Sequence, residues 1–132
     1  MNCLCEIPAT IGSFSLLQEL NLNGNGLEDS YICCLTTLPA SLGALTNLKE
    51  LHLEGNQLSS LPIEIGFLSQ LQILKANNNR LSSIPSSIGD CKSLAEVVFW
   101  SPVELCIHTH FIMSGKYHFG WRTFLHACGC NI

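Results

Sequence analysis

The chain has 132 residues, of which 47% are hydrophobic and 12% are charged, and its formal net charge is -4. This composition fits one folded domain with one core and excludes a disordered chain. The negative balance leaves no basic surface to neutralise a phosphate backbone, so we expect no nucleic-acid partner. No run of about 20 apolar residues is present, and we therefore expect no membrane span.

The first ten residues, MNCLCEIPAT, contain neither the basic region nor the apolar region of a secretory signal. We therefore expect a cytoplasmic location, with the nucleus as the second compartment. The chain contains eight cysteines that follow no regular framework. In a reducing compartment such cysteines are expected to be free thiols.

From Ile7 onward the chain repeats itself. The copies are IPATIGSFSLLQELNLNGNGLED from Ile7, LPASLGALTNLKELHLEGNQLSS from Leu38, LPIEIGFLSQLQILKANNNRLSS from Leu61 and IPSSIGDCKSLAEV from Ile84. The copies from Leu38 onward follow a regular 23-residue period, whereas the step from Ile7 to Leu38 is longer by eight. We therefore place repeats at 7–29, 38–60, 61–83 and 84–97 (partial), with an eight-residue interruption, SYICCLTT, at 30–37.

The first three copies contain the pattern L-x-x-L-x-L-x-x-N-x-L, which is typical of leucine-rich repeats, and the fourth copy is partial and lacks the asparagine. The alternation of Leu51, His52 and Leu53 predicts a short strand with both leucines facing inward. At the turn after each of the first three strands stands an asparagine whose amide can satisfy buried backbone groups, and we predict a structural ladder of Asn25, Asn56 and Asn79.

The segment P-x-x-I-G in each copy predicts one short helical or 3₁₀ turn. Proline suits the first position of such a turn and glycine suits its exit. The residues concerned are Pro8, Pro39, Pro62 and Pro85, with Gly12, Gly43, Gly66 and Gly89. The sequence therefore predicts an α/β solenoid of about four leucine-rich repeats over 1–97, with short parallel strands on the concave face and 3₁₀ or short helical turns on the convex face.

The form LPxxIGxLxxLxxLxLxxNxLxx resembles intracellular leucine-rich repeat proteins related to Ras-binding scaffolds. The run LQILKANNNRLSSIPSSIGDCKSL is most similar to the plant intracellular Ras-group-related members. The resemblance covers about residues 6–97 and implies a non-catalytic scaffold in signalling. It implies a protein partner, such as a small GTPase or another signalling protein.

An extracellular receptor fragment is the alternative. Repeats of plant extracellular receptors resemble 24-residue units that carry Gly two residues before Ile-Pro. Here Ser82 takes that place before Ile84 and Pro85, and the period is shorter by one residue. The spacing therefore favours the intracellular type.

The resemblance places the partner-binding surface on the outward residues of the strands. This surface is polar and of mixed charge, and the other interpretation of any single residue is a solvated strand face. The residues are Gln18, Glu19, Asn21, Asn23, Lys49, Glu50, His52, Glu54, Gln72, Ile73, Lys75, Asn77 and Asn78.

Nothing in the repeats indicates catalysis. His52 is expected to stand alone on its strand, with no cysteine or carboxylate placed to complete a catalytic set. The segment Gly24-Asn25-Gly26 lacks the Gly-Lys-Ser/Thr of a phosphate-binding loop. We therefore predict that the chain is not an enzyme and that its repeats use no cofactor or metal.

The composition changes after Val97, and three interpretations of the tail 98–132 stay open. It is non-repeat sequence without a function, such as a retained intron or a shifted frame produces, or a poor terminal cap that covers the open end of the solenoid. In the third interpretation the tail is an appended zinc site. The candidate ligands are Cys106, His108, His110, His126, Cys128 and Cys130.

Overall fold

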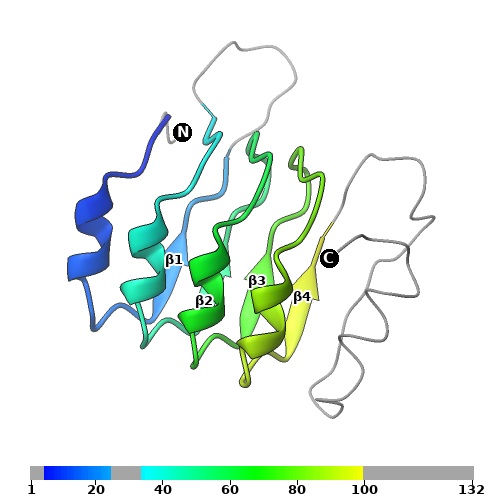
Figure 1. Cartoon of the computed structure of the whole chain (residues 1–132). Coiled ribbons are helices and arrows are strands. Elements are labelled where there is room, and N and C mark those ends of the chain that lie inside the picture. Colours follow the sequence, from blue (N-terminus) through cyan, green and yellow to red (C-terminus); the bar gives the residue numbers. More distant parts are fainter. Residues whose placement is uncertain (1–4, 25–33, 100–132) are drawn as a thin grey trace.

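A computed structural model describes residues 5–24 and 34–99 of the chain. Along these residues, short 3₁₀ helices alternate with short strands (Figure 1). The helices are η1 (Ala9–Ser13), η2 (Ala40–Ala44), η3 (Ile63–Phe67) and η4 (Ser86–Asp90). The strands are β1 (Glu19–Asn21), β2 (Glu50–His52), β3 (Ile73–Lys75) and β4 (Glu96–Val98).

The strands form one parallel sheet in the order β1-β2-β3-β4. The 3₁₀ helices form a second row on one side of this sheet, and each helix lies beside the next (Figure 1). This arrangement confirms the predicted solenoid of about four repeats. None of the helices in the described ranges has the length and apolar character that a membrane span requires.

The core between the two rows consists of the apolar residues of the repeat. Leu48, Leu51 and Leu53 are fully buried around β2, and Leu71 and Leu74 take the same positions in the next coil. Side chains alternate across a strand, so the residues between these leucines face away from the core. The predicted inward face is therefore observed.

The glycines have a role that differs from the predicted one. Each lies at the fourth position of its 3₁₀ helix and not at its exit. For Gly12, Gly43 and Gly66 the reason is close packing against the next coil. A Cβ added to Gly43 would lie 2.7 Å from the carbonyl oxygen of Glu64, and one added to Gly66 would lie 2.7 Å from that of Ser87. The 3₁₀ helices therefore approach one another more closely than any side chain permits.

The prolines lie one residue earlier than predicted. Pro62 precedes η3 with an extended backbone, and its carbonyl oxygen accepts the first hydrogen bond of the turn from the Ile65 N–H at 3.1 Å. The residue in this position needs no N–H for the helix, so the missing donor of proline costs nothing here. The other three prolines have the same backbone geometry.

The described asparagines of the ladder are buried and bond to backbone groups in two coils. Asn79 Nδ2 donates to the carbonyl oxygens of Leu53 at 2.8 Å and Ala76 at 3.0 Å, and Asn79 Oδ1 accepts from the Leu58 N–H at 3.0 Å. Asn56 makes the equivalent set of bonds one coil earlier. Asn25 lies outside the described residues.

The repeat register resumes at Leu35, which lies inside the predicted interruption 30–37. Leu35 is buried, its N–H donates to Asn56 Oδ1 at 3.3 Å, and its carbonyl oxygen accepts from the Gln57 N–H at 2.9 Å. Leu58 makes the same two contacts with Asn79 and Arg80 in the next coil. Repeat geometry therefore begins three residues before the predicted start at Leu38.

At the other end, β4 extends through Val98, and Phe99 packs half-buried against the core. Both residues belong to the segment predicted as a tail. The rest of that segment, with the six candidate zinc ligands and most of the residues of the predicted cap, lies outside the described residues.

The prediction of free thiols is wrong for one cysteine and correct for another. Cys5 is disulfide-bonded. Cys91 carries a free, buried thiol whose Sγ lies 3.1 Å from the carbonyl oxygen of Ile65. The cysteines, taken together, therefore do not indicate a reducing compartment.

The two glycines at equivalent positions of η3 and η4 provide a matched test of close packing. Gly66→Ala forces a Cβ against Ser87, and we expect it to lower the free energy of unfolding by about 1–3 kcal/mol. Among the described residues, no atom lies within 4 Å of a Cβ added to Gly89, so Gly89→Ala is expected to be neutral or to stabilise by up to about 1 kcal/mol. Urea unfolding of both variants measures the difference, and equal losses would contradict this role.

The asparagine ladder makes a second prediction. Asn79→Ala leaves buried carbonyl and N–H groups without partners, and we expect a loss of about 2–4 kcal/mol in the free energy of unfolding. Asn47 is the control, because both of its side-chain bonds are exposed: Nδ2 donates to the Ser15 carbonyl oxygen at 2.7 Å, and Oδ1 accepts from Gln70 Nε2 at 3.2 Å. Asn47→Ala should cost about 0.5–1.5 kcal/mol. A larger loss for Asn47→Ala than for Asn79→Ala would argue against the ladder as the main support of the turns.

Candidate interaction surface

The outward residues of the strands form rows across the sheet, because neighbouring strands pair in register. The first row consists of Glu19 on β1, Glu50 on β2, Ile73 on β3 and Glu96 on β4. We call the side of the sheet that carries these residues the outer face. Two glutamates therefore lie directly opposite each other on β1 and β2.

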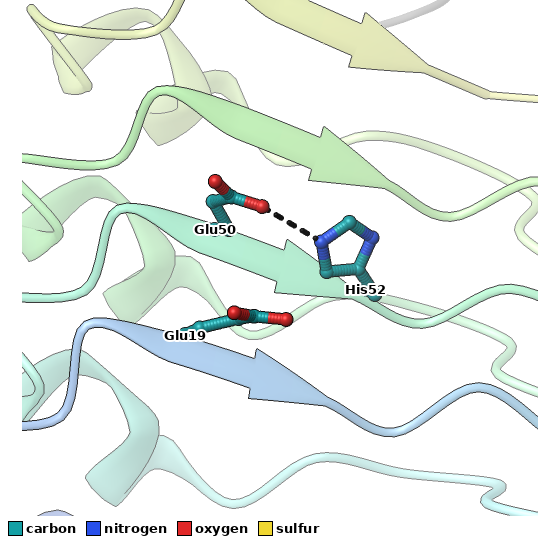
Figure 2. A group of neighbouring side chains, drawn as sticks. All are labelled: Glu19, Glu50 and His52. Atoms are coloured by element: carbon teal, nitrogen blue, oxygen red, sulfur yellow. Dashed lines mark hydrogen bonds and ion pairs between the residues drawn. The ribbon is translucent and has the colours of Figure 1, made fainter.

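The second row consists of Asn21, His52, Lys75 and Val98. His52 was predicted to stand alone, and this prediction is wrong. Its Nε2 lies 3.2 Å from a Glu50 carboxylate oxygen and its Nδ1 lies 3.8 Å from a Glu54 carboxylate oxygen. Figure 2 shows Glu50 and His52 on β2, with Glu19 of β1 beside them. The alternation E-L-H-L-E places Glu50, His52 and Glu54 on one face, and this signal was available in the sequence.

A third row lies where the chain enters the strands. Lys49 Nζ donates to Gln18 Oε1 at 3.1 Å, and the Gln72 N–H donates to the Lys49 carbonyl oxygen at 2.8 Å. Gln18 and Gln72 are exposed and Lys49 is half-buried. These three predicted residues are therefore brought side by side at one edge of the outer face.

The fourth row lies where the chain leaves the strands. Asn23 Nδ2 donates to a Glu54 carboxylate oxygen at 2.8 Å, and the Glu54 N–H donates to Asn23 Oδ1 at 2.8 Å. Asn77 is half-buried in the equivalent position, and its Oδ1 is a buried atom without a hydrogen-bond partner. Asn78 lies in the turn beyond β3 with φ of 57°, so it is set apart from the flat part of the face.

Charge on the outer face is unevenly distributed. The carboxylates of Glu19, Glu50 and Glu54 gather over β1 and β2, and among the described residues it is the imidazole of His52 that faces Glu50 and Glu54. Over β3 and β4, Lys75 Nζ lies 3.7 Å from a Glu96 carboxylate oxygen. The β1–β2 half is therefore acidic, whereas the β3–β4 half is neutralised by its own ion pair.

Within the described ranges, Glu19, Glu50 and His52 are the residues that bring three donors of metal-ligand type together, with the donor atoms within 4.8 Å of one another. Ligands of one zinc ion stand about 2.0–2.2 Å from it, so two of them are separated by at most about 4.4 Å. His52 Nε2 and a Glu50 carboxylate oxygen already lie within hydrogen-bond distance of each other, at 3.2 Å. Exposed acidic groups commonly gather in this way without an ion, so the cluster by itself does not indicate a metal site.

The described side chains offer no activated nucleophile at this face. Both ring nitrogens of His52 face carboxylates, and a catalytic base would instead need one of them directed at a hydroxyl or thiol. The Cys91 thiol is buried, and burial, with a smaller effect of Asp90, raises its pKa to about 11. This thiol stays protonated at neutral pH and does not act as a nucleophile.

Two residues of the face, Glu96 and Val98, were missed by sequence reasoning. They follow Ile73 and Lys75 by one full repeat period and complete the first two rows. The spacing of Leu94 and Val97, which are buried like Leu71 and Leu74, was the signal that could have found them. The predicted surface ended at the third strand because the last repeat was counted as partial.

The glutamates that face each other across β1 and β2 make a stability prediction. Glu19→Gln removes one of two like charges in register, and we expect the free energy of unfolding to rise by about 0.2–0.5 kcal/mol at low salt. The gain should vanish in 0.5 M NaCl, where the Debye length is only about 4 Å. Glu64→Gln removes a carboxylate from η3 instead and should change stability by less. A salt-independent effect of Glu19→Gln would mean that charge repulsion is not its cause.

The comparisons with known proteins agree with this geometry. A family model for the Leucine Rich Repeat matches residues 16–45, 47–68 and 70–91, which is more than half of the chain. Among solved structures, a leucine-rich repeat protein of Leptospira interrogans is similar to this chain, with 34% sequence identity and a TM-score of 0.52. The similarity covers 73% of this chain and 30% of that protein's chain. No curated protein matches the sequence. The matched repeats and the parallel, sequentially ordered strands of this chain show that it belongs to the leucine-rich repeat family.

Proposed function

We propose that the chain is a non-catalytic scaffold that binds a protein partner on the outer face of its sheet. Leucine-rich repeats bind proteins in general, and the family match carries that expectation to this chain. The observation that supports the location is the set of rows on the outer face. Side chains of several strands stand there in register, with polar and charged groups directed away from the core.

The distribution of charge supports a basic partner surface. Glu19, Glu50 and Glu54 leave the β1–β2 half acidic, and within the described residues the imidazole of His52 faces Glu50 and Glu54. A partner that places arginine or lysine there neutralises carboxylates that now repel one another. Arginine suits the site best, because its planar fork of N–H donors can bond to two carboxylates at once.

The finer part of the proposal rests on the resemblance in the repeat consensus. We place the chain among intracellular leucine-rich repeat proteins of the plant Ras-group-related type, in the cytoplasm or the nucleus. Its partner in signalling is then a small GTPase or another signalling protein. The 23-residue period supports this placement over the receptor type.

The size of the face supports weak binding. Four strands about 4.8 Å apart, each about five residues tall, span roughly 15 by 17 Å. This is about a third of the roughly 800 Å² that each partner contributes to a standard interface. A scaffold of this length therefore exchanges its partner rapidly unless other surfaces join the contact.

A second candidate function is favoured by one observation. Cys5 is disulfide-bonded, and disulfides persist mainly in oxidising compartments. A piece of an extracellular receptor ectodomain would carry such a bond. Trapping thiols with N-ethylmaleimide at cell lysis separates the two functions, because Cys5 is alkylated in an intracellular protein and protected in an extracellular one.

Photocrosslinking at defined positions tests the binding face. A benzophenone amino acid at Gln72 lies exposed on the outer face, and one at Ser86 lies exposed on η4. In cells that express the full chain, we expect a protein adduct at Gln72 in several-fold higher yield than at Ser86, because a bound partner covers the sheet. Mass spectrometry identifies the adduct.

A charge-neutral variant sharpens this test. Adding Glu19→Gln and Glu50→Gln should reduce the yield at Gln72, since both carboxylates are proposed to contact the partner. Glu64→Gln, on η3, makes the same chemical change away from the sheet and should leave the yield unchanged. Equal yields at Gln72 and Ser86 would count against the outer face as the binding surface.

A further inference from the structure

The first row of the outer face changes in character from strand to strand. Glu19 on β1 and Glu50 on β2 lie directly opposite each other, and β3 continues the row with the apolar, half-buried Ile73. Carboxylate oxygens of the two glutamates lie within 4.8 Å of each other (Figure 2). Glu19 is exposed, and 42% of the Glu50 side chain is exposed. Across the first three strands the row is therefore acidic, acidic and apolar, and its acidic members are open to contact.

The apolar end of the row does not favour a cation. Lys75 follows Ile73 by two residues on the same strand and faces the same way. Its Nζ lies 3.7 Å from a Glu96 carboxylate oxygen, so the carboxylate of β4 already has a cationic partner. A second cation brought over β3 would meet the ammonium group of Lys75. The row therefore suits cations over β1 and β2 and an apolar side chain over β3.

The spacing of the row distinguishes between backbone forms of a bound segment. Neighbouring strands stand about 4.8 Å apart, so the three positions lie at about 0, 4.8 and 9.6 Å along the row. Residues i, i+3 and i+7 share one face of an α-helix and lie at about 0, 4.5 and 10.5 Å along its axis. Residues i, i+2 and i+4 of an extended segment lie at about 0, 6.8 and 13.6 Å, so the third misses its position by about 4 Å. The row therefore matches a helix that crosses the strands.

We propose that the outer face binds a basic amphipathic α-helix of the protein partner, laid across the strands. Arginine or lysine at positions i and i+3 of this helix faces Glu19 and Glu50, and an apolar side chain at i+7 faces Ile73. This inference rests on the proposed function and names the element of the partner that makes the contact. About ten helical residues span the four strands, since each residue adds about 1.5 Å. A contact of this size is weak, and its charged part weakens further as salt increases.

An NMR titration of the ¹⁵N-labelled full chain with three synthetic peptides tests the helix. The first peptide is a stapled, alanine-based helix with arginine at its fifth and eighth positions and leucine at its twelfth. The second has the same residues without the staple and with a central proline, which prevents a continuous helix. The third is the stapled helix with its second arginine moved to the tenth position, away from the binding face. The first peptide is expected to shift the amide signals of Glu50 and Ile73 and to bind at least about tenfold more tightly than the other two.

Two isoleucine variants test the apolar part of the contact. Ile73→Ser removes the side chain that faces the leucine, and we expect it to weaken binding of the first peptide by about three- to tenfold. Ile63 is the matched control, because it is 65% exposed on η3, away from the sheet. Ile63→Ser should change the affinity by less than about twofold. The amide spectrum of each free variant verifies that the fold is retained.

Several results would overturn the helix. They are equal affinities for the first and second peptides, equal affinities for the first and third, equal effects of the two isoleucine variants, and outer-face signals that stay unchanged up to about 2 mM of the first peptide. The photocrosslinking yields at Gln72 and Ser86 test the proposed function independently. A protein adduct that prefers Gln72, together with no preference for the helical peptide, would therefore reject the helix and leave the binding face in place.

Discussion

The fold depends on satisfying backbone groups inside the turn that follows each strand. A buried carbonyl or N–H without a partner is costly, and these turns bury several of them. Asn79 provides a partner for such groups in two coils at once, because its amide nitrogen donates to the carbonyl oxygens of Leu53 in the preceding coil and of Ala76 in its own. The same amide oxygen holds the Leu58 N–H. One side chain therefore closes a turn and fixes the register between neighbours.

This register explains how far the sequence could predict the structure. The inward leucines recur at fixed spacing, and burial requires that spacing, so the strands and the core could be located in advance. The start of the second coil could not be located in advance, because both Leu27 and Leu35 can take the place of the leucine that follows the asparagine in the repeat pattern. Contacts of Leu35 with Asn56 and Gln57 identify it as the residue in that position. A pattern in one coil cannot choose between two candidates that only the neighbouring coil distinguishes.

Roles that arise between coils were missed for the same reason. A glycine at the end of a short helical pattern is correctly associated with a helix exit in general, yet Gly43 and Gly66 are required by the carbonyl oxygens of the next 3₁₀ helix. Likewise, Glu19 and Glu50 belong to different repeats of the chain and become neighbours only through strand pairing. The polar character of the face was predictable from alternation within each strand. The concentration of acid over β1 and β2 depends on pairing across strands.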